Sequence, residues 1–89
     1  MKAIVTVIGQ DKVGIIASVS TYLAEKNVNI LDINQTIMTD IFTMVMMVDT
    51  EKCNVEFSEF VKGIESLGEN LGVQILATSE KIYKSMHRI

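Results

Sequence analysis

Hydrophobic residues change their spacing several times along this chain, and each change marks an element. Residues 2–8, "KAIVTVI", are apolar and β-branched on both faces, which predicts a central β-strand. From Val13 the apolar residues recur at helical intervals, and the predicted helix ends near Asn27, a residue type that tolerates the left-handed conformation. Its apolar members are Ile15, Ile16, Val19 and Leu23.

The next residues predict a β-hairpin. Residues 28–38, "VNILDINQTIM", alternate between apolar and polar, which predicts a half-buried strand near an edge of the sheet. Thr39 and Asp40 predict a tight turn. Residues 41–49, "IFTMVMMVD", are apolar on both faces and predict a second central strand.

The C-terminal half repeats the alternation of helix and strand. Asn54 is predicted to be the N-cap of a helix that ends at Gly72. Residues 73–78, "VQILAT", predict a fourth strand, and Ser79 is suited to cap a short last helix. One side of that helix is apolar and carries Ile82, Tyr83, Met86 and Ile89.

The predicted order is β-α-β-β-α-β with an added helix, which is the ferredoxin-like arrangement of the α+β class. Right-handed crossovers place both longer helices on one face of a four-stranded antiparallel sheet. The absence of proline and of any linker predicts one domain over residues 1–89, with a core at 1–78 and a C-terminal helix at 79–89. The other face of the sheet is left uncovered although its central strands are apolar, so we expect a homodimer.

Composition narrows the classes of partner and the compartment. The net charge of −3 provides no basic surface, so nucleic acid is not an expected partner. Cys53 is the single cysteine, which rules out an internal disulfide and favours a reducing compartment. The first apolar run ends too soon, at Gln10 and Asp11, for a signal peptide, and no run approaches the roughly 20 residues of a membrane helix. We therefore expect a cytoplasmic protein.

The turn after the first strand has the glycine spacing of a phosphate-binding loop, from Gly9 to Gly14. Ile15 and Ile16 stand where that loop needs Lys and Ser or Thr, so nucleotide binding is not expected. Other proteins of this topology bind metal through Cys-x-x-Cys, phosphate through an arginine, or RNA through paired aromatic residues. This chain lacks each of those groups at the required place.

Nothing in the sequence indicates catalysis or metal binding. Cys53 has no histidine near it in the sequence to serve as a base, and His87, the single histidine, has no evident partner as a metal ligand. The eleven carboxylates are scattered, without a pair suited to acid–base chemistry. We therefore expect no enzymatic activity and no cofactor or metal.

The segment "GQDKVGIIASVSTYLAEKNVNILDINQ" resembles the ACT domain, a small-molecule regulatory module of amino-acid metabolism. The matching pattern is Asp or Asn, two residues, Gly-Ile at the helix start, and Asn-Val-Asn-Ile opening the second strand. The element order fits the family over residues 1–78. The whole chain, including the C-terminal "MHRI", is similar to the small stand-alone ACT proteins of bacteria and archaea, and more distantly to regulators of glycine cleavage.

The resemblance implies a homodimer that binds an amino acid and regulates an unidentified protein partner. By position, Asp11 and Asn29 match the polar residues that contact the ligand in the family. Gly14 matches the glycine that lets a ligand approach the backbone, and Ile15 supplies the following amide. Helix N-terminal amides favour a carboxylate, and Asp11 is suited to pair an ammonium, so these groups would suit a zwitterion.

A purely structural interpretation of the same residues is the alternative. Asp11 is equally well placed as the N-cap of the first helix, Gly9 and Gly14 could serve the turn alone, and Asn29 could bond local backbone. The corresponding function is a ligand-free module for dimerisation or protein–protein interaction. It would use the uncovered sheet face or the apolar side of the last helix.

Overall fold

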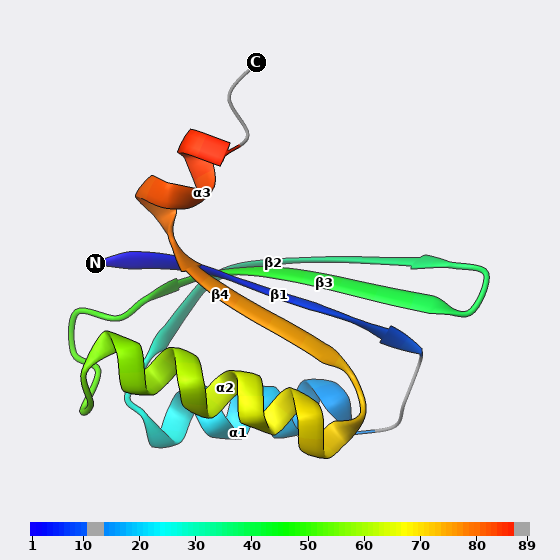
Figure 1. The fold of residues 1–89 in the computed structure, drawn as a ribbon, viewed down its shortest axis with the longest axis horizontal. Coiled ribbons are helices and arrows are strands. Elements are labelled where there is room, and N and C mark those ends of the chain that lie inside the picture. The colour runs from blue at the N-terminus through cyan, green and yellow to red at the C-terminus, as the bar shows by residue number, and fades with distance from the viewer. Residues whose placement is uncertain (11–13, 87–89) are drawn as a thin grey trace.

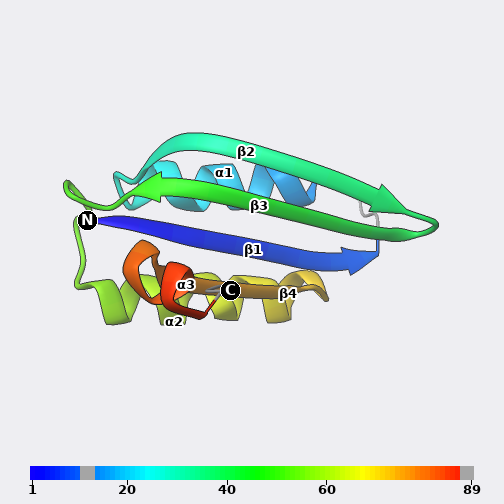
Figure 2. The same cartoon turned by 90° about the horizontal axis from the view of Figure 1, so that it is seen from above.

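The element order predicted from the sequence is the order observed in the computed structural model, which describes residues 1–10 and 14–86, without the side chain of Met86. Predictions that involve Asp11, Val13, His87 and Ile89 fall on residues outside that description. The elements are β1 (Lys2–Gln10), α1 (Ile15–Glu25), β2 (Asn29–Met38), β3 (Ile41–Asp49), α2 (Phe57–Leu71), β4 (Gln74–Ser79) and α3 (Glu80–Met86). The four strands form one antiparallel sheet in the order β2-β3-β1-β4, as Figures 1 and 2 show.

Two helices cover one face of this sheet. Figure 1 shows α1 and α2 on one side of the strands and α3 on the other. The central strands are β1 and β3, as predicted, and every second residue of each is buried against the helices. The largest fully buried side chains are those of Phe60, Leu23, Met44, Met46, Ile64, Val5, Val7, Val19 and Val48.

The opposite face of the sheet is covered only at one end. There α3 packs on β1 and β4, and Ile4 is 5% exposed. Ile8 and Leu76 lie on the same face and remain 37% and 45% exposed. Ser79 caps the last helix as predicted, because its Oγ accepts the Ile82 N–H at 3.2 Å. The short helix therefore docks on its own sheet and leaves the rest of this face open.

The edge strand β2 is not half-buried, contrary to the prediction. All of its residues are exposed except Ile30, which is partly buried. A helix rises about 1.5 Å per residue and a strand about 3.3 Å, so the 11-residue α1 spans about 16 Å beside a 10-residue strand of about 33 Å. Ile33 and Ile37 lie on the helix side of the sheet and are nevertheless 39% and 60% exposed. The hairpin of β2 and β3 thus extends beyond both helices (Figure 1).

Two predicted helix starts are also wrong. The N-cap of α1 is Gly14, in the left-handed conformation at φ 92°, so the helix begins at Ile15 and the N-cap is not Asp11. The N-cap of α2 is Glu56. Asn54 has a different task, because its Nδ2 donates a hydrogen bond to the Glu25 carbonyl at 2.9 Å.

The predicted helix ends are confirmed. Asn27 follows α1 with φ 60°, and Gly72 follows α2 with φ 75°. Both residues take the left-handed conformation that stops a helix and turns the chain towards the next strand.

A tyrosine and a glycine set the approach of α1 to α2. The Tyr22 hydroxyl donates a hydrogen bond to the Phe60 carbonyl at 3.0 Å, and the two rings lie 5.9 Å apart. Gly63 provides the space, because a Cβ at that position would collide with the Tyr22 hydroxyl oxygen. Any larger residue at 63 must displace Tyr22 from its bond.

We predict that Gly63→Ala destabilises the protein by about 2 kcal/mol, a typical cost of overpacking. In a Tyr22→Phe background the same substitution should cost less, because the colliding oxygen is gone and alanine favours a helix by about 1 kcal/mol over glycine. Part of the cost should remain, because two ring carbons would lie 3.1 and 3.3 Å from the new Cβ. Urea unfolding of the two single variants and the double variant measures this coupling. Ser66→Ala, on the exposed side of α2, is the control and should have little effect. Equal costs of Gly63→Ala in both backgrounds would contradict the assignment.

Tyr22 also predicts a pH dependence of stability. Burial raises the pKa of its phenol, and the charge of Cys53 acts in the same direction. The unfolded chain therefore loses this proton first, so stability is complete below about pH 10 and declines as pH rises through the folded pKa. The free energy of unfolding should fall less steeply above about pH 10 in Tyr22→Phe than in the wild type. A Cys53→Ala variant separates the contribution of the thiol.

Candidate functional site

The predicted ligand residues lie at the two ends of α1. Gly14 and Ile15 begin the helix, whereas Asn29 begins β2 after the helix has ended. The helix separates these positions by about 16 Å, the length of its 11 residues. Asp11, the fourth predicted residue, lies outside the described part of the chain. Within one chain, the described residues form two regions and not a single site (Figure 1).

The first region is the N-terminus of α1. The first hydrogen bond of the helix runs from the Ser18 N–H to the Gly14 carbonyl at 2.8 Å, so the three preceding N–H groups have no partner within the helix. Gly14 has no side chain with which to cap them. The Ile15 side chain is buried, so the group that this residue can offer is its backbone amide. Unbonded amides at the positive end of a helix attract an anion such as a carboxylate.

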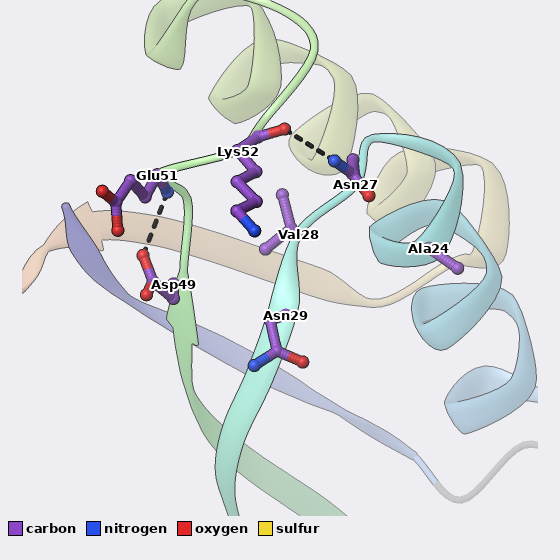
Figure 3. Close-up of a pocket in the computed structure, with 7 residues that line it drawn as sticks. All are labelled: Ala24, Asn27, Val28, Asn29, Asp49, Glu51 and Lys52. Carbon is purple, nitrogen blue, oxygen red and sulfur yellow. Dashed lines mark hydrogen bonds between the residues drawn. The ribbon is translucent and has the colours of Figure 1, made fainter.

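The second region is a pocket of about 580 Å³ at the other end of α1. Its walls are the turn from α1 into β2 and the loop from β3 into α2 (Figure 3). Asn29 and Asp49 stand opposite each other on the paired strands at its floor. The lining residues are Ala24, Asn27, Val28, Asn29, Asp49, Glu51 and Lys52.

Two asparagines fasten the walls of this pocket together. The Asn27 Nδ2 donates a hydrogen bond to the Lys52 carbonyl at 2.9 Å, and the left-handed backbone of Asn27 aims the amide at the loop. Asn54 donates twice in the other direction, from Nδ2 to the Glu25 carbonyl at 2.9 Å and from its N–H to the Lys26 carbonyl at 3.1 Å. These bonds hold the backbone on both sides, so the pocket has fixed walls.

The charged groups of the pocket differ in how they are bonded. Asp49 Oδ1 accepts the Glu51 N–H at 3.0 Å and lies 3.7 Å from the N-terminal ammonium of Met1. Lys52, in contrast, forms no ion pair within residues 1–10 and 14–86. The side-chain amide of Asn29 likewise bonds to none of the residues that are described. A cation and an amide are therefore available to a ligand.

Asp49 and Lys52 were not predicted from the sequence as site residues. Both belong to "DTEK", a polar run that begins at the last residue of a buried strand and is typical of an ordinary loop. The bonds from Asn27 and Asn54 place this loop beside the end of α1, more than twenty residues away in sequence. Contacts between residues so far apart in the chain leave no recognisable pattern in the sequence around either residue.

No group of three or more His, Cys, Asp or Glu residues is arranged to hold a metal ion in residues 1–10 and 14–86. No described helix has the length and apolar character required to cross a membrane.

Comparison with known proteins identifies the fold and the family. The model of the ACT domain matches residues 2–78. The UPF0237 protein of Methanocaldococcus jannaschii is 51% identical over 88 residues, which are 99% of this chain and 98% of that protein. The solved structure of an ACT domain protein from Streptococcus pneumoniae is 40% identical with a TM-score of 0.82 and 94% of both chains covered.

A more distant structure shares the fold alone. It belongs to a protein assigned as a glycine cleavage system transcriptional repressor, with 17% identity and a TM-score of 0.77. The similarity covers 86% of this chain and 45% of that one. The ferredoxin-like arrangement predicted from the sequence is thus confirmed, and on the family match over residues 2–78 this chain belongs to the ACT domain family.

Proposed function

We propose that this chain is a cytoplasmic regulatory module that binds an amino acid as a homodimer and acts on a separate protein partner. ACT domains are typically regulatory modules that bind small molecules, amino acids in particular. The observation that carries the proposal for this chain is the N-terminus of α1, where the N-cap is a glycine and has no side chain to accept from the first amides of the helix.

The ligand groups follow from the chemistry of the residues. The amides at Gly14 and Ile15 bind the α-carboxylate, because they are donors at the positive end of a helix dipole. Asp11 pairs the α-ammonium through its negative charge. Asn29 contributes a side-chain amide that can donate and accept. The buried position of Ile15 keeps the helix start in place while its amide faces the ligand.

A second copy of the chain is needed because these residues lie at opposite ends of α1. The strand β2 is suited to meet that copy. It is an edge strand of 10 residues without lysine or proline, the residues that commonly protect such edges. Leu31, Ile33, Ile37 and Met38 add exposed apolar surface along it. Such an edge is a template for pairing with another strand.

Antiparallel pairing of β2 with β2 of a second copy would join the two regions. Both β1 and β2 run antiparallel to β3, so they run parallel to each other. The end of β1 and the start of α1 therefore lie at the end of the sheet where β2 finishes (Figure 2). Reversing the direction of the second copy turns its Asn29 towards that end, and a pairing centred on the first half of β2 would bring it level with Gly14 of the first. Each dimer then holds two composite sites.

We predict that the variants Asp11→Ala and Asn29→Ala each lose amino-acid binding, and that mixing them restores part of it. In a mixed dimer, one site carries both substitutions and the other carries neither. If half of the dimers are mixed after unfolding and refolding together, about a quarter of the sites regain wild-type affinity. The measurement is a thermal-shift screen with the twenty amino acids followed by calorimetry, since ligand at 100 times its Kd adds about 2.7 kcal/mol of stability.

The matched controls are Glu69→Ala and Asn70→Ala, both exposed on α2 and outside the lining of the pocket. They should bind as the wild type does. Single variants that bind normally would show that the ligand does not contact Asp11 or Asn29. Loss of binding without recovery on mixing would argue against a site shared between copies. If none of the twenty amino acids binds, the ligand-free interaction module is favoured instead.

A further inference from the structure

Asn29 lines the pocket at the C-terminal end of α1. Among the residues that line this pocket, Lys52 is the one with a positively charged side chain. Its backbone is fixed, because its carbonyl accepts the hydrogen bond from Asn27 at 2.9 Å. Its side chain is exposed and forms no ion pair with the described residues. Figure 3 shows it extending from the loop towards Val28, into the space between the end of β3 and the start of β2. The backbone of Lys52 is thus fixed beside the pocket, and its ammonium has no ion-pair partner among residues 1–10 and 14–86.

The two carboxylates of the pocket do not supply that counter-charge. Asp49 is occupied by the Glu51 N–H at 3.0 Å and by the N-terminal ammonium at 3.7 Å. The Glu51 side chain points away from Lys52, to the far side of the loop (Figure 3). An anionic group that enters the pocket would thus meet the ammonium of Lys52 and the unbonded amide of Asn29, and its negative charge would be balanced there.

In the proposed composite site the α-carboxylate of the ligand already has donors, the amides at Gly14 and Ile15 of the other copy. Lys52 and Asn29 are left for the side chain of the ligand. We infer that the pocket between Asn29 and Lys52 receives the side-chain carboxylate of an acidic amino acid, so that the ligand is an amino acid with two carboxylates. This inference rests on the proposed function and specifies the class of ligand for the same site.

A neutral amide side chain tests the inference because it has nearly the same shape as the acid and no charge. Aspartate and asparagine form one such pair, and glutamate and glutamine form the other. Asn29 can bond either member of a pair, since it both donates and accepts. Lys52 offers only donors and a positive charge, so it favours the acid. The preference within each pair therefore reports on Lys52.

The experiment is calorimetry of the intact dimer with L-aspartate, L-asparagine, L-glutamate and L-glutamine. In the wild type we expect the preferred acid to bind about tenfold more tightly than its amide, the range of a charge-assisted hydrogen bond at a partly solvated site. Lys52→Met should remove this preference and leave the affinity for the amide unchanged. Lys52→Arg should keep the preference. Lys62→Met, an exposed lysine on α2 outside the pocket, is the matched control and should change nothing.

Several outcomes would overturn the inference. Equal binding of acid and amide to the wild type would show that the pocket does not select a carboxylate. An equal loss of both ligands in Lys52→Met would place Lys52 at the α-carboxylate. Binding of other amino acids but none of these four would reject the ligand class and leave the proposed function in place. Failure of every amino acid to bind would reject the proposed function itself, and this inference with it.

Discussion

The length of α1 relative to the strands is the constraint on which most features of this protein depend. A helix residue advances the chain less than half as far as a strand residue, so the 11 residues of α1 reach along only about half of the 10-residue β2. The core closes over the first half of the sheet, and the distal half of the hairpin is left uncovered. The same length separates the first turn from the start of β2. Exposure of the edge strand and division of the candidate site therefore have one cause.

Polar contacts fix the position of α1 at its side and at its C-terminal end. At the side of the helix, Tyr22 bonds to the Phe60 carbonyl and fits against Gly63, which sets the distance to α2. At the C-terminal end, Asn27 and Asn54 bond the carbonyls of Lys52 and Glu25 across two loops. These bonds involve backbone atoms, so they fix the path of the chain. Side chains on the same loops, such as Lys52, remain free to contact a ligand.

The two ends of α1 offer complementary chemistry. One end presents backbone amides with a helix dipole behind them, and the other presents a side-chain amide and an ammonium above a pocket. In the proposed site each end would contact a different part of the ligand. Joined through two copies, they would surround it with donors for two anionic groups and with Asp11 for a cationic one. In this arrangement binding and dimer formation are coupled, because the ligand contacts both copies.

The residue pattern alone determined the order of elements, the fold class and the two central strands. Lys2–Gln10 and Ile41–Asp49 are apolar on both faces, a local property that the sheet confirms. The left-handed residues Asn27 and Gly72 were also predictable, since their side chains set their backbone preference. The residues that resemble the ACT domain are also contiguous in the sequence. The family model, which matches residues 2–78, confirms that resemblance.

The errors concern features that depend on the neighbours of a residue. Alternation in β2 predicts a buried side, but burial depends on whether α1 reaches it. Asn54 is a residue type that suits an N-cap, but its side-chain amide donates a hydrogen bond to the backbone carbonyl of Glu25 in α1. The place of Lys52 over the pocket likewise follows from the loop bonding to the end of α1. Local propensity thus determined which elements form, and only the tertiary structure decided what covers them and which distant groups meet, because both depend on contacts between residues far apart in the chain.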